Sequence, residues 1–167
     1  MKWLVAGIGN IFFGDDGFGP EVARELALDP PADANVQDYG IRGLHLAYEL
    51  VSGYDRAIII DAIPRGGVPG TLYVIEPEVG ESGAPPDAHR MDLENVFAFV
   101  RTIGGSAPPL VLVGCEPSAA DEGIGLSEAM RAAVRPAADL VRRLIAEAQA
   151  AHCGDLERST VCTEVLS

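Results

Sequence analysis

The chain has 167 residues, a formal net charge of -13, 48% hydrophobic residues and 22% charged residues. This length and composition fit one globular domain rather than a disordered chain. The acidic balance opposes binding to nucleic-acid phosphates and to anionic lipid. We therefore expect neither a nucleic-acid partner nor a membrane partner.

The chain shows no sign of export or membrane insertion. Its first apolar run is short and is interrupted by Gly and Asp, unlike a signal peptide. No later stretch approaches the ~18 apolar residues of a membrane span. Cys115, Cys153 and Cys162 are widely spaced and form no CxxC pair, which argues against a disulfide framework or a zinc knuckle. We predict a soluble cytoplasmic protein, and nothing in the sequence demands more than a monomer.

Strands and helices are predicted to alternate along the first half of the chain. Residues 2–7 form a compact apolar run that ends in glycine and is typical of a buried strand. After a glycine-rich turn, Pro20 suits the first turn of a helix that we expect to end near Ala27. A short strand at residues 36–39 and a helix at residues 44–51 follow.

The clearest strand is the segment RAIIIDAI at residues 56–63, because three consecutive Ile are typical of a central parallel strand. Ser127 can cap a last helix that is predicted to end near Ala148 and to be kinked at Pro136. The other predicted elements are a strand at 70–75, a helix at 92–103 and a strand at 109–114. We predict a single domain over residues 1–150 and a loosely ordered tail over residues 151–167.

This alternation predicts an α/β fold with a mostly parallel sheet between helical layers. In such sheets ligands bind beyond the carboxyl ends of the strands, where the strand order reverses. The residues that follow each strand are therefore the first candidates for a functional site.

Carboxylates are frequent at these positions. Asp15 and Asp16 lie in the turn after the first strand, Asp38 near the end of the second, and Asp61 inside the isoleucine-rich strand. An ionised Asp among apolar residues is costly unless it is paired or binds a metal. If the first and third strands are neighbours, Asp16 and Asp61 converge, and His89 in the loop before the third helix can close over them. Two carboxylates and one imidazole suit a divalent ion with positions left for water or substrate.

Each of these residues also has a purely structural interpretation. Asp16 could cap the helix that follows, Asp61 could cap a loop, and His89 could be an exposed loop residue. Their predicted convergence favours the metal site.

Other chemistries find less support. The Gly7-Ile8-Gly9 turn lacks the third glycine of a dinucleotide fingerprint, since Phe12 stands there, so we expect no organic cofactor. Cys115 is a candidate nucleophile at the end of an apolar strand, but no histidine is marked as its base partner. Asn10 is expected to hydrogen-bond the backbone of the turn.

Several motifs together resemble those of hydrogenase maturation endopeptidases. The opening signature is Gly-Ile-Gly-Asn at 7–10 followed by Gly-Asp-Asp-Gly-Phe-Gly at 14–19. The resemblance spans about residues 1–145 and continues through DYGIRGL at 38–44, IDA at 60–62, His89, VGCEP at 113–117 and GLS at 125–127. The opening signature, the third-strand aspartate and the loop histidine, in this order, make the resemblance specific.

The resemblance implies a three-layer α/β/α sandwich, phosphorylase/hydrolase-like, with a five-stranded sheet. Its strand order would be 2-1-3-5-4, with strand 4 antiparallel. This order places the first and third strands side by side.

The resemblance also implies an aspartic-type endopeptidase. Its substrate would be the nickel-loaded precursor of a nickel–iron hydrogenase large subunit, from which it removes a C-terminal extension. Asp16, Asp61 and His89 would contact the nickel of the substrate, for which zinc or cadmium can substitute. Apart from the resemblance, the predicted positions of Asp38 and Asp15 after the strands make either carboxylate available as a general base.

The chain departs from the family where the family often reads Asp-Gly-Gly-Thr, because Tyr39 and Ile41 stand in place of Gly and Thr. Asp38 is retained, but a backbone or hydroxyl role at these two positions does not carry over. Two alternatives stay open: a non-catalytic metal-binding chaperone of hydrogenase assembly, and a nucleotide-binding α/β enzyme.

Overall fold

The computed structural model describes residues 1–76, 88–118 and 123–164, with side chains described except at 88–92 and 154–164. Every predicted strand and helix is present, with ends shifted by a few residues except in the last two helices. The elements are β1 (Trp3–Ile8), the 3-10 turn η1 (Gly14–Gly17), α1 (Phe18–Leu28), β2 (Ala34–Gly40), α2 (Gly43–Leu50), β3 (Arg56–Ala62), β4 (Leu72–Ile75), α3 (Ala88–Thr102), β5 (Leu110–Cys115) and α4 (Glu128–Glu164).

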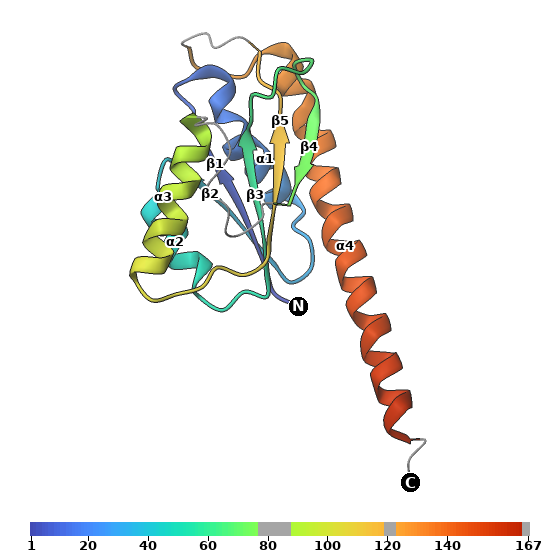
Figure 1. The fold of residues 1–167 in the computed structure, drawn as a ribbon. Helices are drawn as coiled ribbons and strands as arrows, with labels where there is room; N and C mark the ends of the chain where they lie inside the picture. The colour runs from blue at the N-terminus through green and yellow to red at the C-terminus, as the bar shows by residue number, and fades with distance from the viewer. Residues whose placement is uncertain (77–87, 119–122, 165–167) are drawn as a thin grey trace.

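The five strands form one sheet in the order β2-β1-β3-β5-β4. β4 runs antiparallel to β5, and the other pairs are parallel. Helices α1 and α4 cover one face and α2 and α3 the other, which gives three layers (Figure 1). The predicted fold class and strand order are confirmed, and the sheet reverses its order between β1 and β3.

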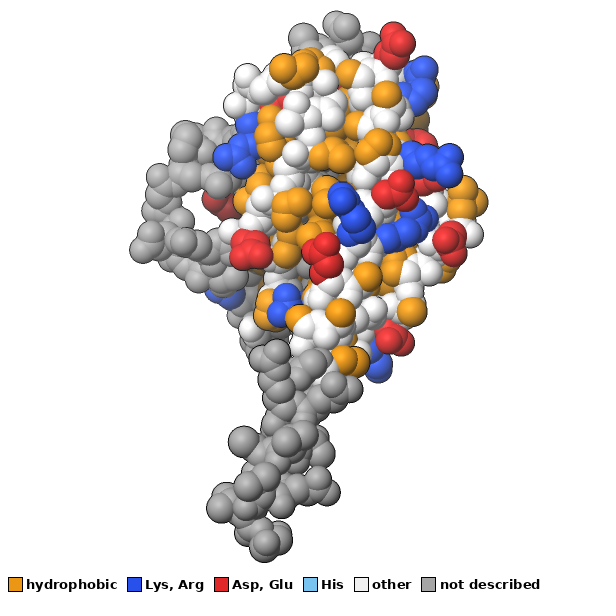
Figure 2. All heavy atoms as spheres, turned by 90° about the vertical axis from the view of Figure 1, so that its right-hand side faces the viewer, with side chains coloured by type: hydrophobic (Ala, Val, Ile, Leu, Met, Phe, Trp, Pro, Cys, Tyr) orange, Lys and Arg blue, Asp and Glu red, His pale blue; other side chains and the backbone are white. Residues whose placement is uncertain are grey.

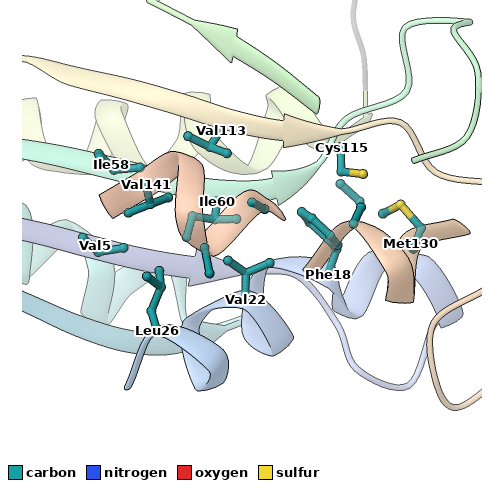
Figure 3. Packing of buried hydrophobic residues seen from close by; sticks show 14 of the residues in the cluster. Val5, Phe18, Val22, Leu26, Ile58, Ile60, Val113, Cys115, Met130 and Val141 are labelled. Carbon is teal, nitrogen blue, oxygen red and sulfur yellow. The ribbon is translucent and has the colours of Figure 1, made fainter. Parts of the chain in front are cut away.

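Side chains of β3 alternate between the two faces, as strand geometry requires. Ile58 and Ile60 are buried against α1 and α4, together with Phe18 of α1 (Figure 3). Ala57 and Ile59 are buried against α2 and α3. Asp61, two residues after Ile59, therefore points to the α2 and α3 side.

The first turn of α1 lies directly on the ends of β1 and β3. A Cβ atom at Gly19 would lie less than 3.0 Å from the carbonyl oxygens of both Ile8 and Ile60. A Cβ atom at Gly7 would in turn lie less than 3.0 Å from the carbonyl oxygen of Gly19. Only residues without a side chain allow this approach, which explains two glycines of the opening motif.

Helix α4 continues well past its predicted end at Ala148. It has 37 residues, passes through Pro136 and ends at Glu164, a length of about 55 Å at the usual rise per residue. Its last turns extend away from the body of the domain (Figure 1). The predicted end was wrong because residues 149–164 contain no proline, and Gly154 alone is too weak a helix breaker.

The face in Figure 2 mixes acidic, basic and hydrophobic side chains. Part of the charge on the helices is paired locally, as between Arg142 and Asp139 on α4 at 3.0 Å and between Arg24 and Glu21 on α1 at 2.6 Å. Within the described ranges, none of the helices has the length and apolar character needed to cross a membrane.

The contact at Gly19 can be tested by adding one methyl group. We expect Gly19→Ala to lower the free energy of unfolding by about 2–3 kcal/mol, because the backbone oxygens around it cannot move without disturbing two strands. Gly123→Ala is the matched control, since a Cβ atom there would meet no atom of the described residues within 4 Å, and its effect should stay within about 0.5 kcal/mol. Urea denaturation of both variants measures the difference, and equal stabilities would contradict the close packing.

Candidate functional site

A cavity of ≈ 410 Å³ opens at the carboxyl ends of β1 and β3. Asp16 and Asp61 both line it, so the structure brings together the two carboxylates nearest the switch point. Its apolar walls come from the β2–α2 turn, α2 and α3, and include Ile41, Leu44 and Phe99. The cavity is thus acidic where it meets the sheet and apolar where it meets the helices.

Asp16 is held by the glycine-rich turn. Its Oδ2 atom accepts a hydrogen bond from the backbone N–H of Asn10 at 2.6 Å. The side chain of Asn10 accepts one from the N–H of Phe12 at 3.0 Å, as expected from the sequence. Gly9, with φ +126°, lets the turn close over the carbonyl oxygen of Asp16. Helix α1 has Gly17 as its N-cap and no side-chain cap, so the interpretation of Asp16 as a helix cap was wrong.

Asp61 is 3% exposed in an otherwise apolar strand. Its Oδ1 atom accepts a hydrogen bond from the N–H of Ala62 at 2.8 Å, a local contact of the kind that a structural role would need. On the neighbouring strand it lies opposite Gly114, which has no side chain. Asp61 thus lies in the cavity wall at the switch point, where burial of a carboxylate is costly unless other groups compensate for it.

The backbone of His89 belongs to the first turn of α3, which begins at Ala88, and the loop predicted for it was wrong. The side chain of His89 lies outside the described residues, so its predicted contact with a metal stays a prediction. Among the side chains that are described, no three His, Cys, Asp or Glu gather closely enough to hold a metal ion.

Asp38 lies beside the cavity rather than in its lining. Its carboxylate contacts Arg24 of α1 at 3.4 Å and is 33% exposed. A Cβ atom at Gly40, which does line the cavity, would lie 3.7 Å from the Oδ1 atom of Asp38. The carboxylate therefore lies at the edge of the cavity mouth.

Asp15 joins three distant segments. Its carboxylate accepts hydrogen bonds from the N–H of Ser118 at 2.8 Å, the N–H of Ser127 at 2.7 Å and the hydroxyl of Ser127 at 2.9 Å. These bonds tie η1 to the segment after β5 and to the start of α4. No local sequence signal could reveal them, because the partners are more than 100 residues away.

Glu116, which the sequence did not single out, anchors the connection between β3 and β4. It is 4% exposed and accepts hydrogen bonds from the N–H of Arg65 at 2.8 Å, the N–H of Gly66 at 3.0 Å and the hydroxyl of Tyr73 at 2.8 Å. Burial acts to raise the pKa of Glu116, but these hydrogen bonds outweigh it and leave the pKa below its ordinary value.

Cys115 is fully buried at the end of β5. Burial, aided by the negative charges of Asp15 and Glu116, raises the pKa of its thiol to about 12. A thiol with this pKa is protonated at neutral pH and is a poor nucleophile, so cysteine catalysis loses support.

The two residues that differ from the family motif, Tyr39 in β2 and Ile41 in the β2–α2 turn, have opposite surroundings. Tyr39 is 4% exposed and packs among the residues buried against α2 and α3. Burial and the nearby Glu49 carboxylate raise the pKa of Tyr39, and its hydroxyl has no hydrogen-bond partner among the described residues. Ile41, by contrast, is 77% exposed.

Two solved structures with this fold are peptidases that mature hydrogenases. The E. coli hydrogenase maturating endopeptidase HybD superposes with a TM-score of 0.74 and 27% identity over 89% of this chain and 94% of that chain. A hydrogenase 2 maturation peptidase from a Thaumarchaeota archaeon has a TM-score of 0.68 and 31% identity over 87% of this chain and 99% of its own. The chain thus has the α/β fold of hydrogenase-maturing peptidases.

The sequence comparisons identify the family. The family model for the hydrogenase maturation protease HycI matches residues 20–144. The hydrogenase expression/formation protein HupD of Bradyrhizobium diazoefficiens is 34% identical over 150 residues, which cover 86% of this chain and 78% of that protein. The chain belongs to the hydrogenase maturation protease family, as the sequence motifs predicted.

The burial and protonation of the Cys115 thiol predict that alkylation of the folded protein selects Cys153 over Cys115. With iodoacetamide at neutral pH, the exposed Cys153 should be modified in the folded protein, whereas the buried Cys115 should react only after unfolding. Tryptic peptides separate the two cysteines, so mass spectrometry reads each one. Equal labelling of both in the native protein would contradict the buried, protonated thiol.

The contacts of Glu116 predict a pH-dependent stability. At pH 7, Glu116→Gln should lower the free energy of unfolding by about 1.5–3 kcal/mol, because the amide cannot accept every bond that the carboxylate accepts. The folded pKa lies below the ordinary value of 4.5, so this stabilisation is complete above that value and is lost as the pH falls through the folded pKa. The difference in the free energy of unfolding between wild type and Glu116→Gln should therefore become smaller in acid.

Urea denaturation at a series of pH values measures this gap. Glu147→Gln on the exposed side of α4 is the control and should stay within about 0.5 kcal/mol of wild type. A gap that is constant down to about pH 3 would show that the charge of Glu116 is not the cause.

Proposed function

We propose that the protein is an endopeptidase that removes the C-terminal extension from a nickel-loaded hydrogenase large-subunit precursor. The observation that carries the proposal is the shared cavity of Asp16 and Asp61 at the switch point, in a chain of the hydrogenase maturation protease family. The proposal keeps the cytoplasmic location and the monomeric state expected from the sequence.

In this proposal Asp16, Asp61 and His89 bind the nickel that the precursor already carries. Carboxylate oxygens and imidazole nitrogen suit a borderline divalent ion, and zinc or cadmium can take the place of nickel. An acid buried to 3% exposure binds a cation more strongly than an acid in water would, because the surrounding dielectric is low. Cleavage then depends on completed metal loading.

Hydrolysis itself needs a base for the attacking water. The water oxygen bonds to the scissile carbonyl carbon while one of its protons passes to a carboxylate. The C–N bond then breaks as the same carboxyl group returns the proton to the leaving amine. Of the two candidates, Asp15 has its oxygens occupied by Ser118 and Ser127. Asp38 has one long contact and lies at the cavity edge. These contacts favour Asp38 as the base and an aspartic-type mechanism.

Substitution of the three proposed ligands tests the site. Asp16→Asn, Asp61→Asn and His89→Ala should each slow processing of a nickel-loaded precursor by about two orders of magnitude or more, the scale on which loss of one charge-stabilising group slows an enzyme. Asp139→Asn is the control, because Asp139 is an exposed acid on α4, and it should process at the wild-type rate. Thermal melts verify folding, and full processing by Asp61→Asn would end the assignment.

A simpler measurement distinguishes the endopeptidase from the alternative of a non-catalytic metal-binding chaperone. When purified wild-type protein is incubated with the loaded precursor, an endopeptidase produces a loss of mass at the precursor's C-terminus. A chaperone would bind the precursor and leave its mass unchanged.

A further inference from the structure

A strip of apolar side chains leads out of the cavity along the seam between α2 and α3. Ile41 and Leu44 line the cavity and are 77% and 53% exposed. Tyr48 follows one helical turn after Leu44 and is 53% exposed. Its ring meets that of Phe99 edge-on, with centroids 5.6 Å apart, and Phe99 again lines the cavity.

The turn that carries Ile41 is braced on both sides. Gly40 has φ +53°, and its carbonyl oxygen accepts a hydrogen bond from the N–H of Gly9 at 3.0 Å. The guanidinium of Arg42 donates to the carbonyl oxygens of Tyr39, at 3.1 Å, and of Asp38. Ile41 is therefore presented to solvent by a fixed backbone, and its branched side chain has few rotamers.

The strip is continuous with the carboxylate site, and this sets it apart from other exposed apolar residues. Leu28 is 81% exposed at the far end of α1, and isolated residues of that kind are ordinary on protein surfaces. Among the described residues that line the cavity, Asp16 and Asp61 are the charged ones. A ligand that fits the whole surface has a cationic centre at one end and an apolar stretch at the other.

We propose that this strip binds an apolar segment of the precursor next to its scissile bond, and that Ile41 determines which precursors are accepted. The inference rests on the proposed function. The nickel would hold one point of the precursor at the carboxylates. The apolar contact at the cavity mouth would then fix the direction in which the precursor chain leaves the cavity.

The test compares three variants on the same nickel-loaded precursor. Ile41→Asp should raise KM for cleavage at least tenfold and change kcat less than twofold, because it removes binding without touching the carboxylates. Ile41→Leu keeps the apolar surface and should retain a KM within twofold of wild type. Leu28→Asp is the control for an added surface charge and should leave both constants unchanged.

A KM of Ile41→Asp within twofold of wild type, or a fall in kcat alone, would overturn the inference. Calorimetric titration of the same precursor supplies a readout that does not need cleavage. If wild type fails to cleave but binds tenfold more tightly than Ile41→Asp, the endopeptidase proposal fails and the docking strip stands. If wild type cleaves and Ile41→Asp binds equally well, the docking strip fails and the endopeptidase proposal stands.

Discussion

The contact between the first turn of α1 and the ends of β1 and β3 determines the geometry of the site. At Gly19 the helix backbone approaches Ile8 and Ile60 more closely than any side chain would allow. The chain leaves β1 at Ile8, passes through the glycine-rich loop and η1, and enters α1 at Phe18. This path puts Asp16 beside the end of β3, where Asp61 lines the same cavity. Glycine in the opening motif is therefore a packing requirement with a functional consequence.

Acidic residues in this end of the molecule do two different kinds of work. Asp15 and Glu116 accept hydrogen bonds from N–H and hydroxyl groups of distant segments, which fixes the loops that frame the site. Asp16 and Asp61 line the cavity, and each also accepts a hydrogen bond from a nearby backbone N–H. Part of the negative charge of the chain therefore has a structural role, because these carboxylates accept the hydrogen bonds that join loops without secondary structure.

Prediction from sequence succeeded where the cause is local or topological. The Ile-rich run of β3 identified a central strand, and the strand order known from the resembling family placed Asp16 and Asp61 at one switch point. It failed where the cause is distant: the partners of Glu116 in the β3–β4 region lie 43 to 51 residues away. Helix ends were the other weakness. α3 begins at Ala88, directly after Pro85, Pro86 and Asp87, although these residues are ordinary start signals for a helix. α4 runs far beyond Ala148 because no proline stands in residues 149–164.

The β2–α2 turn shows how one short segment separates stability from recognition. Alternation along the strand sends Tyr39 into the layer beneath α2, where burial leaves its hydroxyl without a partner among the described residues. That cost is tolerable only because the ring adds apolar contact to the core. Ile41 gains no comparable burial, since 77% of it remains exposed on a braced turn. Packing therefore explains the tyrosine but not the isoleucine, whose exposed apolar surface is the part of the turn that the proposed precursor contact would use.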